Sequence, residues 1–176
     1  MILTEPVAAP TIERAPALSP AQLLGVVRDL AHARDRWREL VRHTPTQRWF
    51  LRVAAHDGFD CWLIGWDAHQ GVAFHDHGGS AGALYVVDGE LFETSALRDR
   101  PRARVEQQLR AGTARAFGAD HVHRVVNRSA AVATSVHVYS PPLVSMDFYD
   151  GTGDVPLRRT HTESALAVRS GPGELR

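Results

Sequence analysis

The chain has 176 residues, of which 44% are hydrophobic and 23% charged, a composition typical of a globular domain rather than of a disordered segment. Its 20 basic and 20 acidic residues cancel, so no electrostatic attraction to nucleic acid or to an anionic membrane is expected. Cys61 is the sole cysteine, which excludes an intrachain disulfide and agrees with a reducing, cytoplasmic location. No apolar run approaches the roughly 18 residues that a membrane-spanning helix needs.

The sequence of the N-terminal region predicts a flexible arm followed by helices. Residues 1–18 contain several prolines and no apolar stretch of the kind found in secretory signals, so we expect a flexible arm. The folded domain is expected over 19–160, with helices over 19–43. Ser19 suits the N-cap of a helix, and Gln22 has the spacing of a capping box. Apolar residues then recur at helical spacing, which indicates packing against the rest of the domain.

After the helices the pattern changes to short apolar stretches separated by Gly, Asp and Asn. This alternation predicts antiparallel strands and an all-β sandwich or barrel. The expected strands cover residues 48–55, 59–66, 83–87, 90–94, 103–109, 114–117, 122–126 and 132–139. The final residues, 161–176, are rich in Gly, Pro and Arg, and we expect them to form a flexible tail.

Two of the histidine pairs have the spacing of metal ligands. His75 and His77 flank one aspartate at the edge of a predicted strand, and His121 and His123 flank one valine on a later strand. Residues i and i+2 of a strand point to the same face, so either pair could reach one ion. A barrel would bring the two segments together. Nitrogen ligands suit iron, zinc, copper or nickel, and ligand type alone does not choose among these metals.

The sequence around these histidines resembles the cupin motifs. The first pair, with a glycine twelve residues after His77, resembles the first motif, and HRVVN resembles the second. Asn127 in that second motif favours His123 as the ligand over His121, which could instead line the pocket or support the ligands. Gly82 stands where many cupins place a glutamate ligand, so a carboxylate in the metal site is not expected.

Residues 48–147 more specifically resemble the thiol dioxygenases, and among them the bacterial cysteine dioxygenases that carry an arginine. The resemblance is carried by Trp66 nine residues before the HDH segment, by GEL starting at Gly89, by HRVVN, and by SVHVYSPP starting at Ser135. It implies a single-domain cupin, which is an antiparallel jelly-roll barrel, with Fe(II) as cofactor. The implied iron ligands are His75, His77 and His123.

The resemblance also implies roles for other side chains. Ser135, His137 and Tyr139 alternate along one predicted strand and so share a face, and in the family they form a hydrogen-bonded chain that directs the tyrosine hydroxyl to the metal. Arg52 has apolar neighbours, and a buried guanidinium needs an anion. The matching arginine of the family holds the substrate carboxylate. The pocket is expected to be lined by Phe50, Trp66, Gly82 and Met146.

The same resemblance implies a substrate, and it also shows two positions at which this sequence differs from other members of the family. Relatives that oxidise 3-mercaptopropionate carry Gln in place of Arg52 and tend to carry Arg in place of Met146, so L-cysteine is the expected substrate. Vertebrate members have a cysteine at the position of Gly82 that joins the tyrosine covalently, and this bond cannot form here. Phe50 replaces a tyrosine and removes one hydroxyl near the carboxylate.

The expected activity is oxidation of L-cysteine with O2 to cysteine sulfinate by a cytoplasmic monomer that has no nucleic-acid or membrane partner. Three alternatives stay open. One is a dioxygenase of 3-mercaptopropionate or another small thiol. Another is a non-catalytic cupin that binds a metal or a small ligand. The third is a cupin with other metal chemistry, such as zinc-dependent sugar isomerisation.

Overall fold

The structure is a computed structural model that describes residues 15–150 and 158–164. Within these residues the helical elements come first, as α1 (Pro20–His32), η1 (Arg34–Arg36) and η2 (Arg38–Leu40). The strands that follow are β1 (Trp49–Ala55), β2 (Asp60–Trp66), β3 (Gly71–His75), β4 (Ala81–Asp88), β5 (Glu90–Leu97), β6 (Arg100–Arg110), β7 (Ala114–Phe117), β8 (His121–Val126), β9 (Ala133–Ser140), β10 (Ser145–Asp150) and β11 (Arg158–Ser164).

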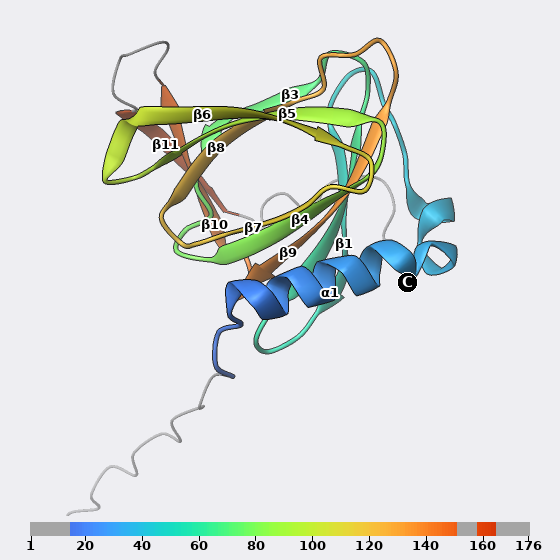
Figure 1. Cartoon of the computed structure of the whole chain (residues 1–176), viewed down its shortest axis with the longest axis horizontal. Helices are drawn as coiled ribbons and strands as arrows, with labels where there is room; N and C mark the ends of the chain where they lie inside the picture. Colours follow the sequence, from blue (N-terminus) through green and yellow to red (C-terminus); the bar gives the residue numbers. More distant parts are fainter. Residues whose placement is uncertain (1–14, 151–157, 165–176) are drawn as a thin grey trace, which may run out of the picture.

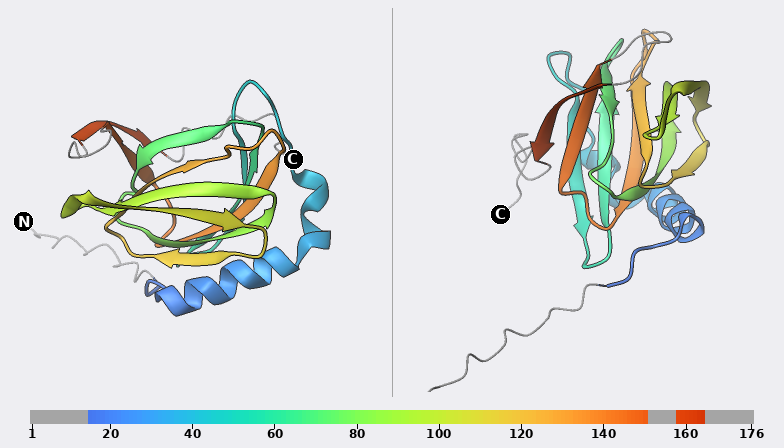
Figure 2. Two further views of the ribbon diagram at one scale, coloured as in Figure 1. Left: turned by 45° about the horizontal axis from the view of Figure 1, so that its top comes forward. Right: turned by 90° about the vertical axis from the view of Figure 1, so that its left-hand side faces the viewer.

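The strands form two antiparallel sheets. One has the order β1-β2-β9-β4-β7 and the other the order β11-β10-β3-β8-β5-β6. Strands that are distant in sequence are neighbours in each sheet, as in the double-sheet jelly roll. Figures 1 and 2 show the sheets facing each other around a common interior, with α1 outside the first sheet. The expected all-β cupin barrel with short N-terminal helices is therefore confirmed.

The helix α1 begins at the predicted cap and covers the outer face of the first sheet. Ser19 and Gln22 form the capping box, in which the Gln22 side chain accepts the Ser19 backbone N–H at 2.9 Å. Leu23, Val27 and Ala31 recur every four residues and are buried against the sheet. The helix therefore closes off one side of the first sheet and leaves the other side for the barrel interior.

Strand β9 separates these two environments, and all eight of its residues are buried. Val136 and Val138 pack in the cluster beneath the helix. Alternation along the strand turns Ser135, His137 and Tyr139 to the opposite face, which is the barrel interior. The helix and the candidate site thus share one strand and use its two faces.

Some differences from the predicted organisation occur at the chain ends. Leu18, the last residue of the expected arm, donates its backbone N–H to the Ser140 hydroxyl at 2.8 Å, whereas residues 1–14 lie outside the described part. Strand β11 pairs with β10 and includes residues 161–164, so the expected tail at 161–176 begins too early. The remainder of that tail is outside the described residues. No helix in the described ranges has the length and apolar character needed to cross a bilayer.

Candidate metal centre

Three buried histidines converge inside the barrel. His75 ends β3, His77 follows two residues later, and His123 lies on β8 directly opposite His75 in the antiparallel register. One ligand atom from each lies within 4.8 Å of those of the other two. The ring centroids are 4.6 Å apart for His75 and His123, and 5.0 Å apart for each pair that includes His77. The structure therefore brings together the three predicted ligands.

The remaining ring nitrogens suit the binding of a metal. The Nδ1 atom of His75 contacts the Ala73 carbonyl at 2.8 Å, and that of His123 contacts Glu93 Oε1 at 2.7 Å, so the Nε2 atom of each is left for another partner. Neither ring nitrogen of the buried His77 has a hydrogen-bond partner in the described part of the chain. A buried polar atom without a partner is costly, and a divalent metal would satisfy it.

The electrostatic environment keeps the three imidazoles neutral. Burial lowers the pKa of His75 and His77 well below the ordinary value, and the neighbouring histidines lower it further. Burial also lowers the pKa of His123, although Glu93 opposes this change. A neutral imidazole has the free lone pair that metal coordination requires. The cluster is therefore ready to bind a metal at neutral pH.

The short turn between the two ligands of the HDH segment is held by Asp76. Its buried carboxylate accepts the Gly78 backbone N–H at 2.9 Å and the Tyr149 hydroxyl at 2.6 Å, and it forms an ion pair with Arg98 at 2.9 Å. These three contacts come from the turn itself, from β10 and from the segment after β5. They fix the path of the backbone between His75 and His77.

A second cluster lies behind His123 and consists of Glu93, His121 and Arg115. Glu93 Oε1 is 2.7 Å from His123 Nδ1 and 2.9 Å from His121 Nε2, while Oε2 is 3.1 Å from the Arg115 guanidinium. Burial alone would raise the pKa of Glu93, but hydrogen bonds from the two histidines and the charge of Arg115 hold it below the ordinary value. Glu93 is therefore a buried carboxylate, and His121 contacts it through Nε2 while the His121 ring packs edge-on against His123, with centroids 4.8 Å apart.

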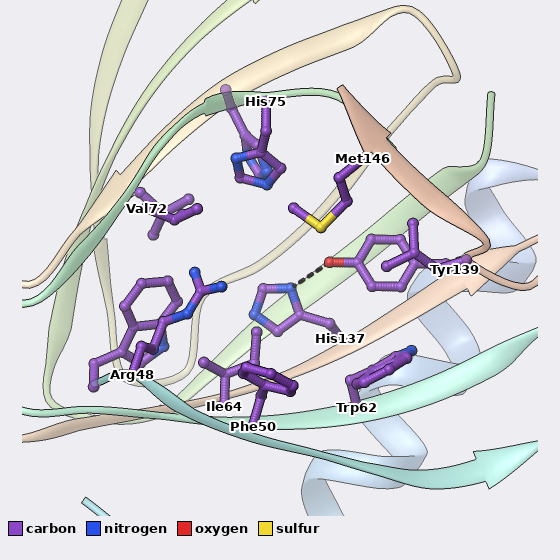
Figure 3. Close-up of a pocket in the computed structure, with 13 residues that line it drawn as sticks. Arg48, Phe50, Trp62, Ile64, Val72, His75, His137, Tyr139 and Met146 are labelled. Atoms are coloured by element: carbon purple, nitrogen blue, oxygen red, sulfur yellow. Dashed lines mark hydrogen bonds between the residues drawn. The ribbon is translucent and has the colours of Figure 1, made fainter. Parts of the chain in front are cut away.

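The predicted chain on β9 is present and extends further than the sequence suggested. The Trp66 indole N–H donates to Ser135 Oγ at 2.9 Å, Ser135 Oγ is 2.8 Å from His137 Nε2, and His137 Nδ1 is 3.3 Å from the Tyr139 hydroxyl. Figure 3 shows the last of these contacts facing the cavity. Trp66 on the neighbouring strand β2 is thus the first member of the chain.

The hydrogen atoms of this chain can be assigned in one continuous direction. An indole N–H can only donate, so Ser135 Oγ accepts from Trp66 and can give its own hydrogen to His137 Nε2. His137 is then the tautomer that carries its hydrogen on Nδ1 and donates it to the Tyr139 oxygen. Burial lowers the pKa of His137 to about 3 and raises the pKa of Tyr139 above its ordinary value, so both groups are neutral. In this arrangement the Tyr139 O–H is free to donate into the cavity.

A small, mainly apolar cavity adjoins the histidines. It leaves about 60 Å³ for the centres of water-sized molecules, which is room for several waters or for one small ligand. Its polar groups come from His75, His123, His137, Tyr139 and Arg48. The other lining residues are Phe50, Trp62, Ile64, Trp66, Val72, Val125, Leu143 and Met146. Of the expected lining residues, Phe50, Trp66 and Met146 are therefore in place.

The arginine in this cavity is Arg48 and not Arg52. The Arg48 guanidinium carbon lies 5.0 Å from the centroid of the Trp66 ring and points into the cavity in Figure 3. No hydrogen bond or ion pair joins its guanidinium to another described residue, and burial lowers its pKa. Arg52 lies 5.9 Å from the Trp62 ring and lines a separate hollow beside α1 and η2. The sequence-based placement of Arg52 in the pocket is thus corrected.

The strand geometry explains this difference. Phe50 lies opposite Ile64 and Arg52 lies opposite Trp62, so the indole of Trp62 closes the cavity wall on the side of Arg52. Four residues of extended chain span about 13 Å, which places Arg48 and Arg52 at different ends of the wall.

Gly82 also differs from its expected role, because it does not belong to the cavity lining. It lies opposite Tyr139 in the pairing of β4 with β9. A Cβ atom at this position would lie 2.6 Å from two ring carbons of Phe117 and 3.0 Å from Cδ1 of Tyr139. Phe117 stacks on His77, with ring centroids 5.0 Å apart and an interplanar angle of 24°. The glycine thus provides space for a phenylalanine that supports a metal ligand.

Sequence reasoning missed three residues of this centre, namely Arg48, Glu93 and Phe117. Glu93 had a usable signal, since it alternates with Leu91 and Ser95 on the buried face of β5. An acidic residue on an otherwise buried strand face must have a partner. Phe117 had no signal beyond its place at the end of an expected strand. Arg48 directly preceded a strand and could not be distinguished from Arg52 by alternation.

Comparison with known protein families found one matching family model. The model described as cysteine dioxygenase type I matches residues 21–152. This range begins in α1, ends just after β10, and contains the three histidines, the β9 chain and Arg48. A comparison with curated protein sequences found no match.

Comparison with solved structures found similar folds. A structure from Thermus thermophilus is 25% identical with a TM-score of 0.51, and the match covers 60% of this chain and 93% of that one. A conserved protein with a double-stranded β-helix domain from Klebsiella pneumoniae subsp. pneumoniae is 17% identical with a TM-score of 0.50, and the match covers 70% of this chain and 93% of that one. These matches support the barrel architecture.

Proposed function

The chain belongs to the cysteine dioxygenase type I family, and from this premise we propose that it is an iron-dependent dioxygenase that converts L-cysteine and O2 to cysteine sulfinate. One observation carries the proposal. One small cavity is bounded by two of the candidate metal ligands, His75 and His123, by Tyr139 and by Arg48. These groups match the thiol, the reacting oxygen and the carboxylate of a small amino acid.

The metal would be held by His75, His77 and His123, whose nitrogens suit it and whose rings are neutral. When bound, Fe(II) would supply the redox centre for joining dioxygen to sulfur. In the overall reaction the thiol sulfur gains both oxygen atoms and loses four electrons, which O2 accepts, and the product is a sulfinic acid. Because the three ligands carry no charge, the positive charge of the metal favours binding of an anionic thiolate.

Arg48 is the group that we assign to the substrate carboxylate, in place of Arg52. The Arg48 side chain is partly buried and its guanidinium lies beside Trp66. No described carboxylate forms an ion pair with it, and Glu163 acts on it only as a more distant charge that raises its pKa. A charged group in such a site gains most when an anionic ligand arrives. A carboxylate held there would fix the substrate with its sulfur towards the histidines, and this orientation lowers the entropic cost of the reaction.

Tyr139 has the role of a hydrogen-bond donor to the reacting oxygen or sulfur. Its pKa is raised by burial, so the hydroxyl keeps its hydrogen at neutral pH. His137 occupies the lone pair of the phenol oxygen, and the O–H is then directed into the cavity. A donor that is already oriented stabilises developing negative charge without reorganisation.

The test compares oxygen uptake and product mass for the Fe(II)-loaded chain with L-cysteine and with 3-mercaptopropionate. We expect one O2 consumed per L-cysteine and cysteine sulfinate as the product. Arg48→Gln should raise the apparent KM for L-cysteine about 10- to 100-fold, the range for loss of a charged hydrogen bond. The matched control is Arg52→Gln, which should leave KM within about twofold.

The alternatives give different results in the same experiment. Preference for 3-mercaptopropionate would keep the metal centre and overturn L-cysteine as the substrate. No oxygen uptake with either thiol by iron-loaded protein would favour a non-catalytic binding cupin. A larger effect of Arg52→Gln than of Arg48→Gln would return the carboxylate site to Arg52.

A further inference from the structure

Glu93 is a buried carboxylate directly beside His123, and the proposed reaction gives it no role. It is fully buried on β5 and faces the barrel interior between Leu91 and Ser95. Burying a carboxylate is costly unless several groups compensate its charge. Three do so here, since His123, His121 and Arg115 all contact it. A carboxylate that is costly to bury therefore lies directly behind His123, a candidate metal ligand.

The contacts of Glu93 determine which nitrogen of His123 carries the hydrogen. An ionised carboxylate can only accept, so the 2.7 Å contact requires a hydrogen on His123 Nδ1. The lone pair of His123 is then on Nε2. The other oxygen of Glu93 forms an ion pair with Arg115 at 3.1 Å, which opposes rotation of the carboxylate away from the ring.

We propose that Glu93 is a positioning residue of the metal centre, which holds His123 with Nε2 available to the metal, and that His121 is its second donor rather than a ligand. A carboxylate behind a metal-bound histidine fixes the tautomer and the ring orientation and makes the ligand more basic. The inference rests on the metal site of the proposed function but not on its substrate. Glu93, His121 and His123 could also be read as a second metal group, but Oε1 of Glu93 already accepts hydrogen bonds from both rings, so we assign this set as the support of the first site.

The main test is Glu93→Gln, which keeps the shape of the side chain. If the glutamine carbonyl stays on Arg115, its NH2 group faces the histidines and selects the wrong tautomer of His123. We expect the dissociation constant for Co(II) to increase about 10- to 100-fold, the usual effect of losing such a partner. The Co(II) absorption band should also change, because it reports the ligand geometry.

A second variant distinguishes positioning from simple packing. In Glu93→Gln/Arg115→Gln the NH2 group of residue 93 can donate to the new carbonyl at 115, and the carbonyl of residue 93 can accept from His123. This double variant should recover most of the Co(II) affinity and the original band. If Glu93 only stabilised the fold, the double variant would lose more stability and recover no affinity.

The matched control is Glu106→Gln on the neighbouring strand β6, an exposed glutamate paired with Arg128 at 2.6 Å. It should bind Co(II) like the wild type. Unchanged affinity and absorption in Glu93→Gln, or an equal loss in Glu106→Gln, would overturn the proposal.

A measurement on the unchanged chain covers the case in which Glu93→Gln does not fold. Ring-nitrogen NMR of the metal-free protein should show His123 with its hydrogen on Nδ1, and a hydrogen on Nε2 would refute the assignment. None of these readouts involves a thiol, so a failure of the proposed oxidation would leave them interpretable.

Discussion

At the scale of single residues, Gly82 shapes the metal centre because it has no side chain. The ring of Phe117 occupies the space that a Cβ atom would take. Gly82→Ala should therefore destabilise the fold by about 1–3 kcal/mol, the usual cost of overpacking a core. Chemical denaturation would measure this loss. Gly25→Ala is the control, because a Cβ there meets nothing within 4 Å, and it should be neutral or stabilising.

The residue scale also shows what sequence patterns could and could not predict. The two histidine pairs and the alternation of Ser135, His137 and Tyr139 were readable because period-two spacing on a strand fixes a shared face. The choice between Arg48 and Arg52 was not readable. The two arginines are four residues apart and so have the same parity along the extended chain, and only the packing of Trp62 on the adjacent strand separates them.

At the scale of elements, the helix α1 stabilises the back of the strand that carries the Tyr139 chain. Leu23 is fully buried in the cluster that includes Val136 and Val138 of β9. Leu23→Ala should cost about 2–5 kcal/mol of unfolding free energy, as expected for a buried leucine. Arg28→Ala, at an exposed position of the same helix, should change stability by less than about 0.5 kcal/mol. Chemical denaturation would compare the two variants, and a larger loss for Arg28→Ala than for Leu23→Ala would contradict this packing.

The strands differed in how well they could be predicted. Those with clear apolar alternation, such as β2 and β9, were recovered from the sequence to within a few residues. Strands β3, β10 and β11 were not among the expected strands. No side chain of β10 is fully buried and β11 is exposed throughout, so neither has an apolar alternation to read. Their positions follow from pairing, since β10 pairs with β3 and β11 pairs with β10.

At the scale of the whole molecule, a bound metal should couple separate parts of the barrel. His75 on β3, His77 in the following turn and His123 on β8 would be held by one ion. A ligand that binds only the native state stabilises it by about 2.7 kcal/mol at one hundred times its dissociation constant. Adding metal should therefore raise Tm, and a chelator should reverse the change.

The variant His123→Ala provides the control for this effect. It should lose the metal and show the same Tm with and without added ion. A metal-dependent rise in Tm in this variant equal to that of the wild type would place the ion elsewhere. At this scale the fold was predicted correctly. The strand and turn signals indicated an all-β sandwich or barrel, and the resemblance to the cupin motifs implied the barrel.

The chain of hydrogen bonds behind Tyr139 has a consequence for how protons travel during turnover. Its far end is the indole of Trp66, a group that neither accepts a proton nor releases one at physiological pH. The chain therefore offers no proton-transfer path to bulk water. It can orient the phenol, but it cannot take a proton from the phenol or return one to it. A proton that the substrate loses or the product gains therefore does not travel along this chain.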